Sequence, residues 1–347
     1  MPNALSQFTE TVSGGRGLTR EEASAAALAL VSETVTDAER EAFLLALARK
    51  GETADEVLGF AAAYRGICRR PDFGDVPSRA IDIVGTGGDR SGSFNISSAS
   101  ALVVAAAGVP VLKHGNRSIT SKSGSADFLA GLGVRLEADD AALRTAVERA
   151  GFCYLFAPAF HPAFKAVGPV RRSLAEKGVK TVFNVLGPLI NPASPAFMSV
   201  GVYDERWVEP IASALGGLGV RRGIVVHSRA GGGMDEITTA GECRVRGCGE
   251  LASVDAVWLP GDFGFHACAI EDLRGGTPEQ NLAMMSDLLV GAVPPGLIDT
   301  LCLSAGAALW VAGRASDPAA GAAAARSIVL GGGLREQLRR LRSAYEA

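Results

Sequence analysis

The sequence from Ile81 to Leu132 reads IDIVGTGGDRSGSFNISSASALVVAAAGVPVLKHGNRSITSKSGSADFLAGL, and this stretch decides the fold. An apolar run at Ala80–Val84 predicts a strand, and the glycine-rich segment Gly85–Asp89 predicts a loop after it. The run Ala99–Ala107 is apolar throughout and predicts a buried helix. A second short strand is expected at Val109–Lys113. The order strand, glycine loop, helix, strand is typical of an α/β protein.

The polar residues of this stretch suit a polyanion. Glycines in Gly85–Gly88 let the backbone approach a ligand closely. Residues Asn95–Ser98 stand where a helix N-cap is expected, so free N–H groups and the positive end of the helix dipole should face the loop. Lys113 and Arg117 add positive charge, and an arginine can hold two oxygens at once. The segment therefore predicts a site for a phosphorylated ligand.

The common nucleotide-binding motifs do not fit this stretch. The third glycine of G-x-G-x-x-G would fall at Arg90, and no G-x-x-x-x-G-K-[ST] pattern occurs. A purely structural interpretation, in which glycines turn a tight corner, would be enough for Gly85–Gly88. It does not explain the basic cluster Lys113–Arg117 one strand later.

At these residues the sequence resembles the anthranilate phosphoribosyltransferase family. The family patterns G-T-G-G-D, N-I-S-[ST], K-H-G-N-R-x-x-[ST]-S and G-S-A-D stand at Gly85–Asp89, Asn95–Ser98, Lys113–Ser121 and Gly124–Asp127. The resemblance implies transfer of the 5-phosphoribosyl group of phosphoribosyl pyrophosphate to the amine of anthranilate, a step of tryptophan biosynthesis. It also implies an α/β fold in which a small all-helical N-terminal domain precedes a larger domain with a mainly parallel central sheet flanked by helices.

The resemblance further implies a set of binding residues. Those expected to bind phosphoribosyl pyrophosphate are Gly85, Gly88, Asp89, Ser93, Asn95, Ile96, Ser97, Ser98, Lys113, His114, Gly115, Asn116, Arg117, Ser118, Ile119, Thr120, Ser121 and Ser125. Those expected to bind anthranilate are Gly85, Asn116, His161 and Arg171, with Arg171 holding its carboxylate. No residue is assigned as acid or base, because an aniline-type amine is neutral at pH 7; His114 is the candidate proton acceptor.

Asp235 and Glu236 follow a glycine loop and form a candidate magnesium site, since Mg²⁺ takes one or two carboxylates and keeps phosphates and waters as its other ligands. Alone, such a pair is more often solvated on a surface loop. The resemblance implies two Mg²⁺ ions per active site, with Asp235 and Glu236 as ligands and Ser97 reaching the second ion. The pair Arg171-Arg172 would likewise be a solvated helix face without the family context.

The first 70 residues predict a helical bundle. Capping boxes at Thr19–Glu22, Thr36–Glu39 and Thr53–Glu56 each open a run with helical spacing, and Lys50-Gly51 should end the second of these helices. We expect a helical domain over residues 1–75, joined in space by helices from about 160–185, and a catalytic domain over 76–347. The segment Ala46–Thr53 resembles the family pattern A-L-x-x-K-G-E-T, which implies a homodimer through the helical domain.

Apolar runs after residue 80 alternate between strand and helix lengths, which predicts a mainly parallel sheet with ligands at the carboxyl ends of its strands. The further strands are expected at Cys153–Phe156, Met198–Val202, Gly223–His227 and Ala256–Leu259. The further helices are expected at Asp127–Leu132, Ala141–Ala150 and Trp207–Leu218, with four more between Thr277 and Ala347. Pro188 and Pro192 predict a stiff structural turn between two of these segments.

Composition limits the function classes. The 347 residues carry a net charge of −3, which excludes a broad basic field for nucleic acid. The apolar runs are too short to span a bilayer and no signal peptide is visible, so we expect a cytoplasmic protein without membrane contact. Six cysteines without zinc-ligand spacing predict ordinary thiols in a reducing compartment.

Three alternative functions stay open at this point. The first is a phosphoribosyltransferase for a related aromatic amino acid, because the chain between Arg171 and Thr181 is longer than in the family and places Lys180 where arginine is common. The second is a pyrimidine nucleoside phosphorylase of the same fold, which the segment Lys113–Arg117 disfavours. The third is a non-catalytic nucleic-acid-binding paralogue, which the net charge disfavours. Ser304, where N-A-A is typical, is a further departure from the family.

Overall fold

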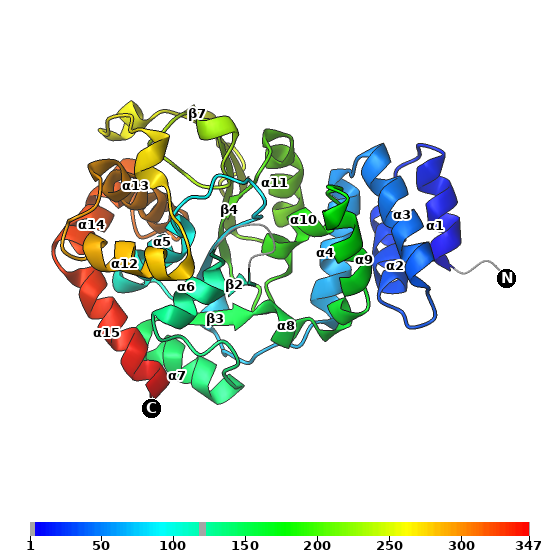
Figure 1. Ribbon diagram of the computed structural model, residues 1–347, viewed down its shortest axis with the longest axis horizontal. Helices are drawn as coiled ribbons and strands as arrows, with labels where there is room; N and C mark the ends of the chain where they lie inside the picture. Colours follow the sequence, from blue (N-terminus) through cyan, green and yellow to red (C-terminus); the bar gives the residue numbers. More distant parts are fainter. Residues whose placement is uncertain (1–3, 118–122, 347) are drawn as a thin grey trace.

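The computed structural model describes residues 4–117 and 123–346, and a seven-stranded sheet runs through its larger part (Figure 1). The strands are β1 (Ile81–Gly85), β2 (Val111–Gly115), β3 (Phe152–Phe156), β4 (Phe197–Gly201), β5 (Arg222–Ser228), β6 (Cys243–Gly249) and β7 (Asp255–Trp258). Their order in the sheet is β3-β2-β1-β4-β5-β6-β7. The first five are parallel, whereas β6 and β7 are antiparallel to their neighbours. The mainly parallel sheet is as predicted, but β6 was not expected.

The strand order reverses at β1, because the chain continues to β2 on one side and returns to β4 on the other. In such sheets, ligands bind beyond the carboxyl ends of the strands at the reversal. β1 and β4 stay paired from Ile81–Phe197 to Gly85–Gly201, whereas the ladder between β1 and β2 holds only the pair Ile81–Val111. The strands β1 and β2 therefore separate toward the end at which the site is expected.

Helices cover both faces of the sheet in the larger domain (Figure 1). One apolar core joins a sheet face to α5, α7, α13, α14 and α15, and a second core joins the opposite face to α11 and the N-terminal helices. The helices of this domain are α5 (Ile96–Ala106), α6 (Ser125–Gly131), α7 (Asp140–Ala150), α8 (Ala157–Phe160), α11 (Val208–Gly217), α12 (Pro278–Leu288), α13 (Pro295–Val311), α14 (Pro318–Leu330) and α15 (Gly333–Glu346). Four helices follow Thr277, as predicted.

A small helical domain lies at one end of the molecule (Figure 1). Its N-terminal helices are α1 (Ala4–Ser13), α2 (Arg20–Leu30), α3 (Asp37–Lys50) and α4 (Ala54–Ile67). All three predicted capping boxes are formed, at the start of α2, α3 and α4. Gly51 follows α3 with φ of 86°, a conformation that glycine adopts without strain.

The helices α9 (Gly168–Glu176) and α10 (Phe183–Leu186) share the apolar core of α1–α4, through buried side chains such as Leu174 and Phe183. The chain thus returns to the helical domain after β3. The division of the chain after residue 75 stays a prediction. Across residues 4–117 and 123–346, no helix combines the length and apolar character that a bilayer crossing needs.

Candidate active site

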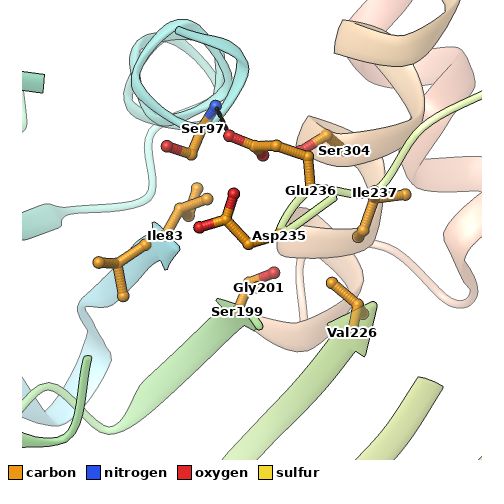
Figure 2. Close-up of a pocket in the computed structure, with 10 residues that line it drawn as sticks. Ile83, Ser97, Ser199, Gly201, Val226, Asp235, Glu236, Ile237 and Ser304 are labelled. Atoms are coloured by element: carbon orange, nitrogen blue, oxygen red, sulfur yellow. Dashed lines mark hydrogen bonds between the residues drawn. The ribbon is translucent and has the colours of Figure 1, made fainter. Parts of the chain in front are cut away.

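Two acidic residues accept hydrogen bonds from backbone N–H groups of the glycine loop and of α5. The Gly87 N–H donates to Asp235 Oδ2 at 2.6 Å. The Ser97 N–H donates to Glu236 Oε1 at 3.1 Å (Figure 2). Asp235 fits there because Gly85 and Gly201 have no side chains, and a Cβ on either would overlap it. The acidic pair therefore stands at the carboxyl ends of β1 and β4, where the strand order reverses.

The electrostatics of this pair favour a bound cation. Burial, together with the negative charges of Asp89 and Glu236, raises the pKa of Asp235 well above its usual range. Burial also raises the pKa of Glu236 to about 7, against the opposing effect of the Ser97 N–H. Buried carboxylates near one another are costly to ionise unless a positive charge joins them. A divalent cation would remove that cost.

The donor atoms suit Mg²⁺ rather than a softer metal, since Ser97, Asp235 and Glu236 offer only oxygens. All three line one cavity of about 10 Å³, roughly the space of a single water molecule (Figure 2). Ser304 lines the same cavity, so this departure from the family pattern lies beside the acidic pair. Within the described ranges, no group of three His, Cys, Asp or Glu side chains could hold a metal by itself. A magnesium site here would need substrate phosphates and waters as further ligands.

Lys113, on β2, lies next to Ser97 and is almost fully buried. Its ammonium donates to the Ile83 carbonyl and, at 3.5 Å, to Ser97 Oγ. Burial lowers the pKa of Lys113, while the charges of Asp82, Glu236 and Asp235 oppose that effect. Its buried charge therefore interacts with Asp82 and with both members of the acidic pair.

Asp82 and Asn191 fill the space where β1 and β2 separate. The Asn191 side-chain amide donates to Asp82 Oδ2 and to the Leu112 carbonyl, both at 2.8 Å, and the His114 N–H donates to Asp82 at 3.3 Å. Burial raises the pKa of Asp82 to about 6. This pair was not predicted from the sequence, although a carboxylate between the apolar residues Ile81 and Ile83 was a visible signal.

The two histidines of the expected site are buried and lie together, with ring centroids 5.3 Å apart. The Nδ1 of His114 lies 3.2 Å from the Gly187 carbonyl, and the Nε2 of His161 lies 2.9 Å from the Ile190 carbonyl. Burial lowers the pKa of His114 to about 3 and that of His161 to about 4, so both are neutral at pH 7. With Nδ1–H donating to Gly187, His114 Nε2 is an acceptor, and it has no partner among the described residues.

Arg171 projects from α9 toward the same region. Its guanidinium lies 4.8 Å from the centroid of the Phe183 ring, and no ion pair neutralises it within the part of the chain that the structure describes. Phe164 packs against both Phe183 and His161, so one aromatic cluster holds Arg171 and His161 near each other. Among the described residues, Arg171 is therefore a cation without a carboxylate partner, and its charge is available to a negatively charged ligand.

The segment before α5 begins the helix where the sequence predicts it. Asn95 is the N-cap residue, and its side chain makes no capping hydrogen bond. Its Oδ1 instead accepts from the Asn281 side chain at 2.8 Å, and this contact ties the start of α5 to α12. Ser93 Oγ accepts from Ser91 at 3.2 Å, and the Ser98 hydroxyl is buried without a partner among the described residues.

The basic loop after β2 is described as far as Arg117. Arg117 pairs with Asp127 at 2.5 Å and is 61% exposed, while Asn116 Oδ1 accepts from the Arg117 N–H. Ser125 Oγ lies 2.9 Å from the Tyr154 hydroxyl, and both would overlap a Cβ on Gly115. The other expected residues of this loop, Ser118, Ile119, Thr120 and Ser121, lie outside the described residues.

Comparisons with known proteins show what the chain is similar to. Residues 77–333 match the model of the glycosyl transferase family, a/b domain, and residues 6–67 match the model of its helical bundle domain. An anthranilate phosphoribosyltransferase of Rhodospirillum rubrum is 44% identical, covering 98% of this chain and 95% of the relative. One of Natronomonas pharaonis is 43% identical, covering 97% and 99%.

Solved structures of anthranilate phosphoribosyltransferases are also similar to this chain. The crystal structure of anthranilate phosphoribosyltransferase from Thermus thermophilus is similar with a TM-score of 0.89 at 40% identity, covering 98% of this chain and 99% of that one. The enzyme from Saccharomyces cerevisiae in complex with PRPP and Mg has a TM-score of 0.86, covering 99% and 98%. At 22% identity, the second likeness concerns the fold alone.

Proposed function

Because the chain belongs to the anthranilate phosphoribosyltransferase family, we propose that it transfers the 5-phosphoribosyl group of phosphoribosyl pyrophosphate to the amine of anthranilate. The products are N-(5-phosphoribosyl)anthranilate and pyrophosphate, in tryptophan biosynthesis. The observation that carries the proposal is the acidic pair Asp235 and Glu236, which meets the N–H groups of Gly87 and Ser97 where the strand order reverses. Carboxylate oxygens that can bind a cation and N–H groups of anion-binding loops therefore meet at one point. This combination suits a diphosphate with a bound metal ion.

The donor half of the site would consist of the glycine loop, the start of α5 and the basic loop after β2. Asp235, Glu236 and Ser97 would hold Mg²⁺, which supplies positive charge to the diphosphate oxygens when bound. The buried ammonium of Lys113 adds a fixed charge next to Ser97. As the C1–O bond breaks, negative charge grows on the leaving diphosphate, and donors already in place stabilise it. Loss of one such donor should slow the reaction about a hundredfold, or about 3 kcal/mol.

The acceptor half would lie between Arg171, His161 and Asn116. Arg171 would hold the carboxylate of anthranilate, and the neutral amine would attack C1 of the ribose as the diphosphate leaves. The new C1–N bond leaves a proton in excess on nitrogen. His114 Nε2 would accept that proton, because its Nδ1–H points to the Gly187 carbonyl. A weak base is sufficient, since an alkylated anilinium ion gives up its proton readily.

The proposal also includes two Mg²⁺ per active site, a homodimer through the helical domain and a cytoplasmic location. Leu28 and Ile67 support a partner surface, because these large apolar side chains of α2 and α4 are 43% and 42% exposed. All six cysteines are free thiols, which supports a reducing compartment. We also propose the domain division after residue 75, with a catalytic domain over 76–347 whose helices α9 and α10 join the helical domain in space.

Loss of anthranilate fluorescence in the presence of phosphoribosyl pyrophosphate and Mg²⁺ tests the proposal. We expect turnover that requires both, together with release of one pyrophosphate per anthranilate consumed. Ring-substituted anthranilates in parallel reactions show which acceptor is preferred. If no acceptor is consumed and the donor produces no heat in calorimetry with Mg²⁺, the proposed function is wrong.

A further inference from the structure

Lys180 reaches the glycine loop from the helical side of the molecule. It lies between α9 and α10, in the connection that also carries Lys177, whose ammonium forms a surface ion pair with Glu41 of α3 at 2.5 Å. The Lys180 ammonium donates to the Gly88 carbonyl at 3.2 Å. A segment packed with the helical domain thus holds the loop that follows β1.

An aromatic ring fixes the position of this ammonium. Lys180 Nζ lies 3.3 Å from the centroid of the Tyr203 ring, at the distance of a strong cation–π contact. Tyr203 is itself held to the glycine loop, because its N–H donates to Thr86 Oγ1 at 3.0 Å, and its hydroxyl accepts from Trp207 Nε1 at 3.0 Å. Lys180, Tyr203 and the glycine loop therefore form one connected unit.

The charge of Lys180 is not neutralised by an ion pair. Neighbouring Lys177 pairs with Glu41, but Lys180 has no carboxylate within 4.0 Å among the described residues. An ammonium has three N–H groups, and Gly88 takes one of them. The remaining donors are available beside a loop in which Gly87 and Gly88 both adopt positive φ, at 71° and 77°. Burial and the charge of Arg90 lower the pKa of Lys180, so its charge is more costly here than in open solvent.

We propose that Lys180 is a positioning residue for the donor: it holds the Gly88 carbonyl, keeps the glycine loop in its positive-φ conformation and lends a cation to the diphosphate of the bound substrate. This proposal rests on the proposed function, since it concerns the same donor. It adds a residue outside the three donor loops and makes the helical domain a contributor to donor affinity.

Three variants test this role: Lys180→Ala, Lys180→Arg, and Lys177→Ala as the matched control on the same connection. Calorimetry with phosphoribosyl pyrophosphate and Mg²⁺ gives donor affinity, and steady-state assays give the KM of each substrate. We expect Lys180→Ala to weaken donor binding about tenfold while the KM of anthranilate changes less than about twofold. Lys180→Arg should retain most of the affinity, because arginine keeps the charge and stacks on aromatic rings. Lys177→Ala should bind the donor like the wild type.

The outcomes separate this role from simple surface packing. If Lys180→Ala binds the donor as tightly as the wild type, or if Lys177→Ala weakens binding equally, the proposal is wrong. If the wild type itself shows no heat with the donor, the proposed function fails and the role of Lys180 fails with it. Circular dichroism melts of all three variants check that the fold is retained. If Lys180→Ala is unfolded, Lys180→Met replaces it, because methionine keeps much of the side-chain length and removes the charge. Lys180→Met should then weaken donor binding by a similar factor, and wild-type affinity in that variant would overturn the proposal.

Discussion

The carboxylate of Asp235 lies against Gly85, in the space that a side chain on that glycine would fill. This contact joins the loop after β5 to the end of β1, although the two residues are far apart in the sequence. It also brings Asp235 within 2.6 Å of the Gly87 N–H. The glycine at position 85 is thus required by close packing of the acidic pair, because its φ is not positive.

Gly85→Ala should therefore damage the site more than the fold. The added methyl group displaces the Asp235 carboxylate, and we expect kcat/KM to fall about a hundredfold, with a stability loss of about 1–2 kcal/mol. Gly66→Ala is the matched control, because a Cβ at this exposed position in α4 meets open space. That control should be as stable as the wild type or more so, since alanine favours helix. Full activity in Gly85→Ala would show that Asp235 does not need its observed position.

Glu236→Gln should change how stability depends on pH. The pKa of Glu236 is raised to about 7, so its stabilising contribution is complete below the usual pKa of 4.5 and is lost as pH rises through 7. Glutamine cannot ionise and avoids this loss. Without metal, we expect the Tm of the variant minus that of the wild type to be near zero at pH 5 and to grow to a few degrees at pH 8.5.

Magnesium gives the same variant a second readout. At pH 8.5, Mg²⁺ should raise the Tm of the wild type more than that of Glu236→Gln, because the variant lacks one carboxylate ligand. Thermal melts in EDTA and in Mg²⁺ measure both effects. A Tm difference that is the same at pH 5 and pH 8.5, or an equal response to the metal, would contradict the assignment of Glu236.

Local patterns predicted much of this fold. The capping boxes begun by Thr19, Thr36 and Thr53 each satisfy their own helix within four residues, so they can be recognised without a tertiary structure. Strand β6 was missed because its sequence, Cys243–Gly249, alternates buried residues with arginine and contains glycine, which lowers its β-propensity. The alternation of apolar residues with arginine, which has a period of two, was the signal that could have revealed this strand.

Contacts between residues that lie far apart in the sequence could not be predicted from such local patterns. The Asn95 side chain bonds to Asn281, 186 residues away, and Asp82 bonds to Asn191, 109 residues away. These partners meet only because the topology brings α12 to the start of α5 and the turn after α10 to β1. The grouping of Ser97 with Asp235 and Glu236 was expected from the family resemblance, and the structure places the three in one cavity. Their roles as metal ligands stay a prediction.

Arg171→Ala should affect the acceptor and spare the donor. The Arg171 guanidinium has no ion-pair partner among the described residues and is held against Phe183, so its charge is available to a carboxylate. Loss of a charge-assisted bond should raise the KM of anthranilate about 10- to 100-fold, with donor affinity nearly unchanged. Arg172→Ala, at the exposed neighbouring position, is the control and should behave like the wild type. An equal loss of donor affinity in Arg171→Ala would overturn its role.

Asp82→Ala should destabilise the protein strongly, because it leaves the His114 N–H and one N–H of Asn191 without an acceptor and removes a counter-charge of buried Lys113. We expect a loss of about 2–4 kcal/mol in the free energy of unfolding, measured by urea denaturation. Asp82→Asn keeps one acceptor oxygen and a similar volume, so its loss should be smaller.

The pH dependence of the two variants then distinguishes hydrogen bonding from charge. Burial raises the pKa of Asp82 to about 6, so its contribution is complete below the usual value of 3.8 and is lost as pH rises through 6. The stability advantage of the wild type over Asp82→Asn should therefore shrink between pH 5 and pH 8, because asparagine has no proton to lose. Asp82→Ala should remain less stable than Asp82→Asn at both pH values, since its missing acceptor does not depend on protonation. Equal stability of the two variants would mean that the bonds to His114 and Asn191 do not hold β1 and β2 in place.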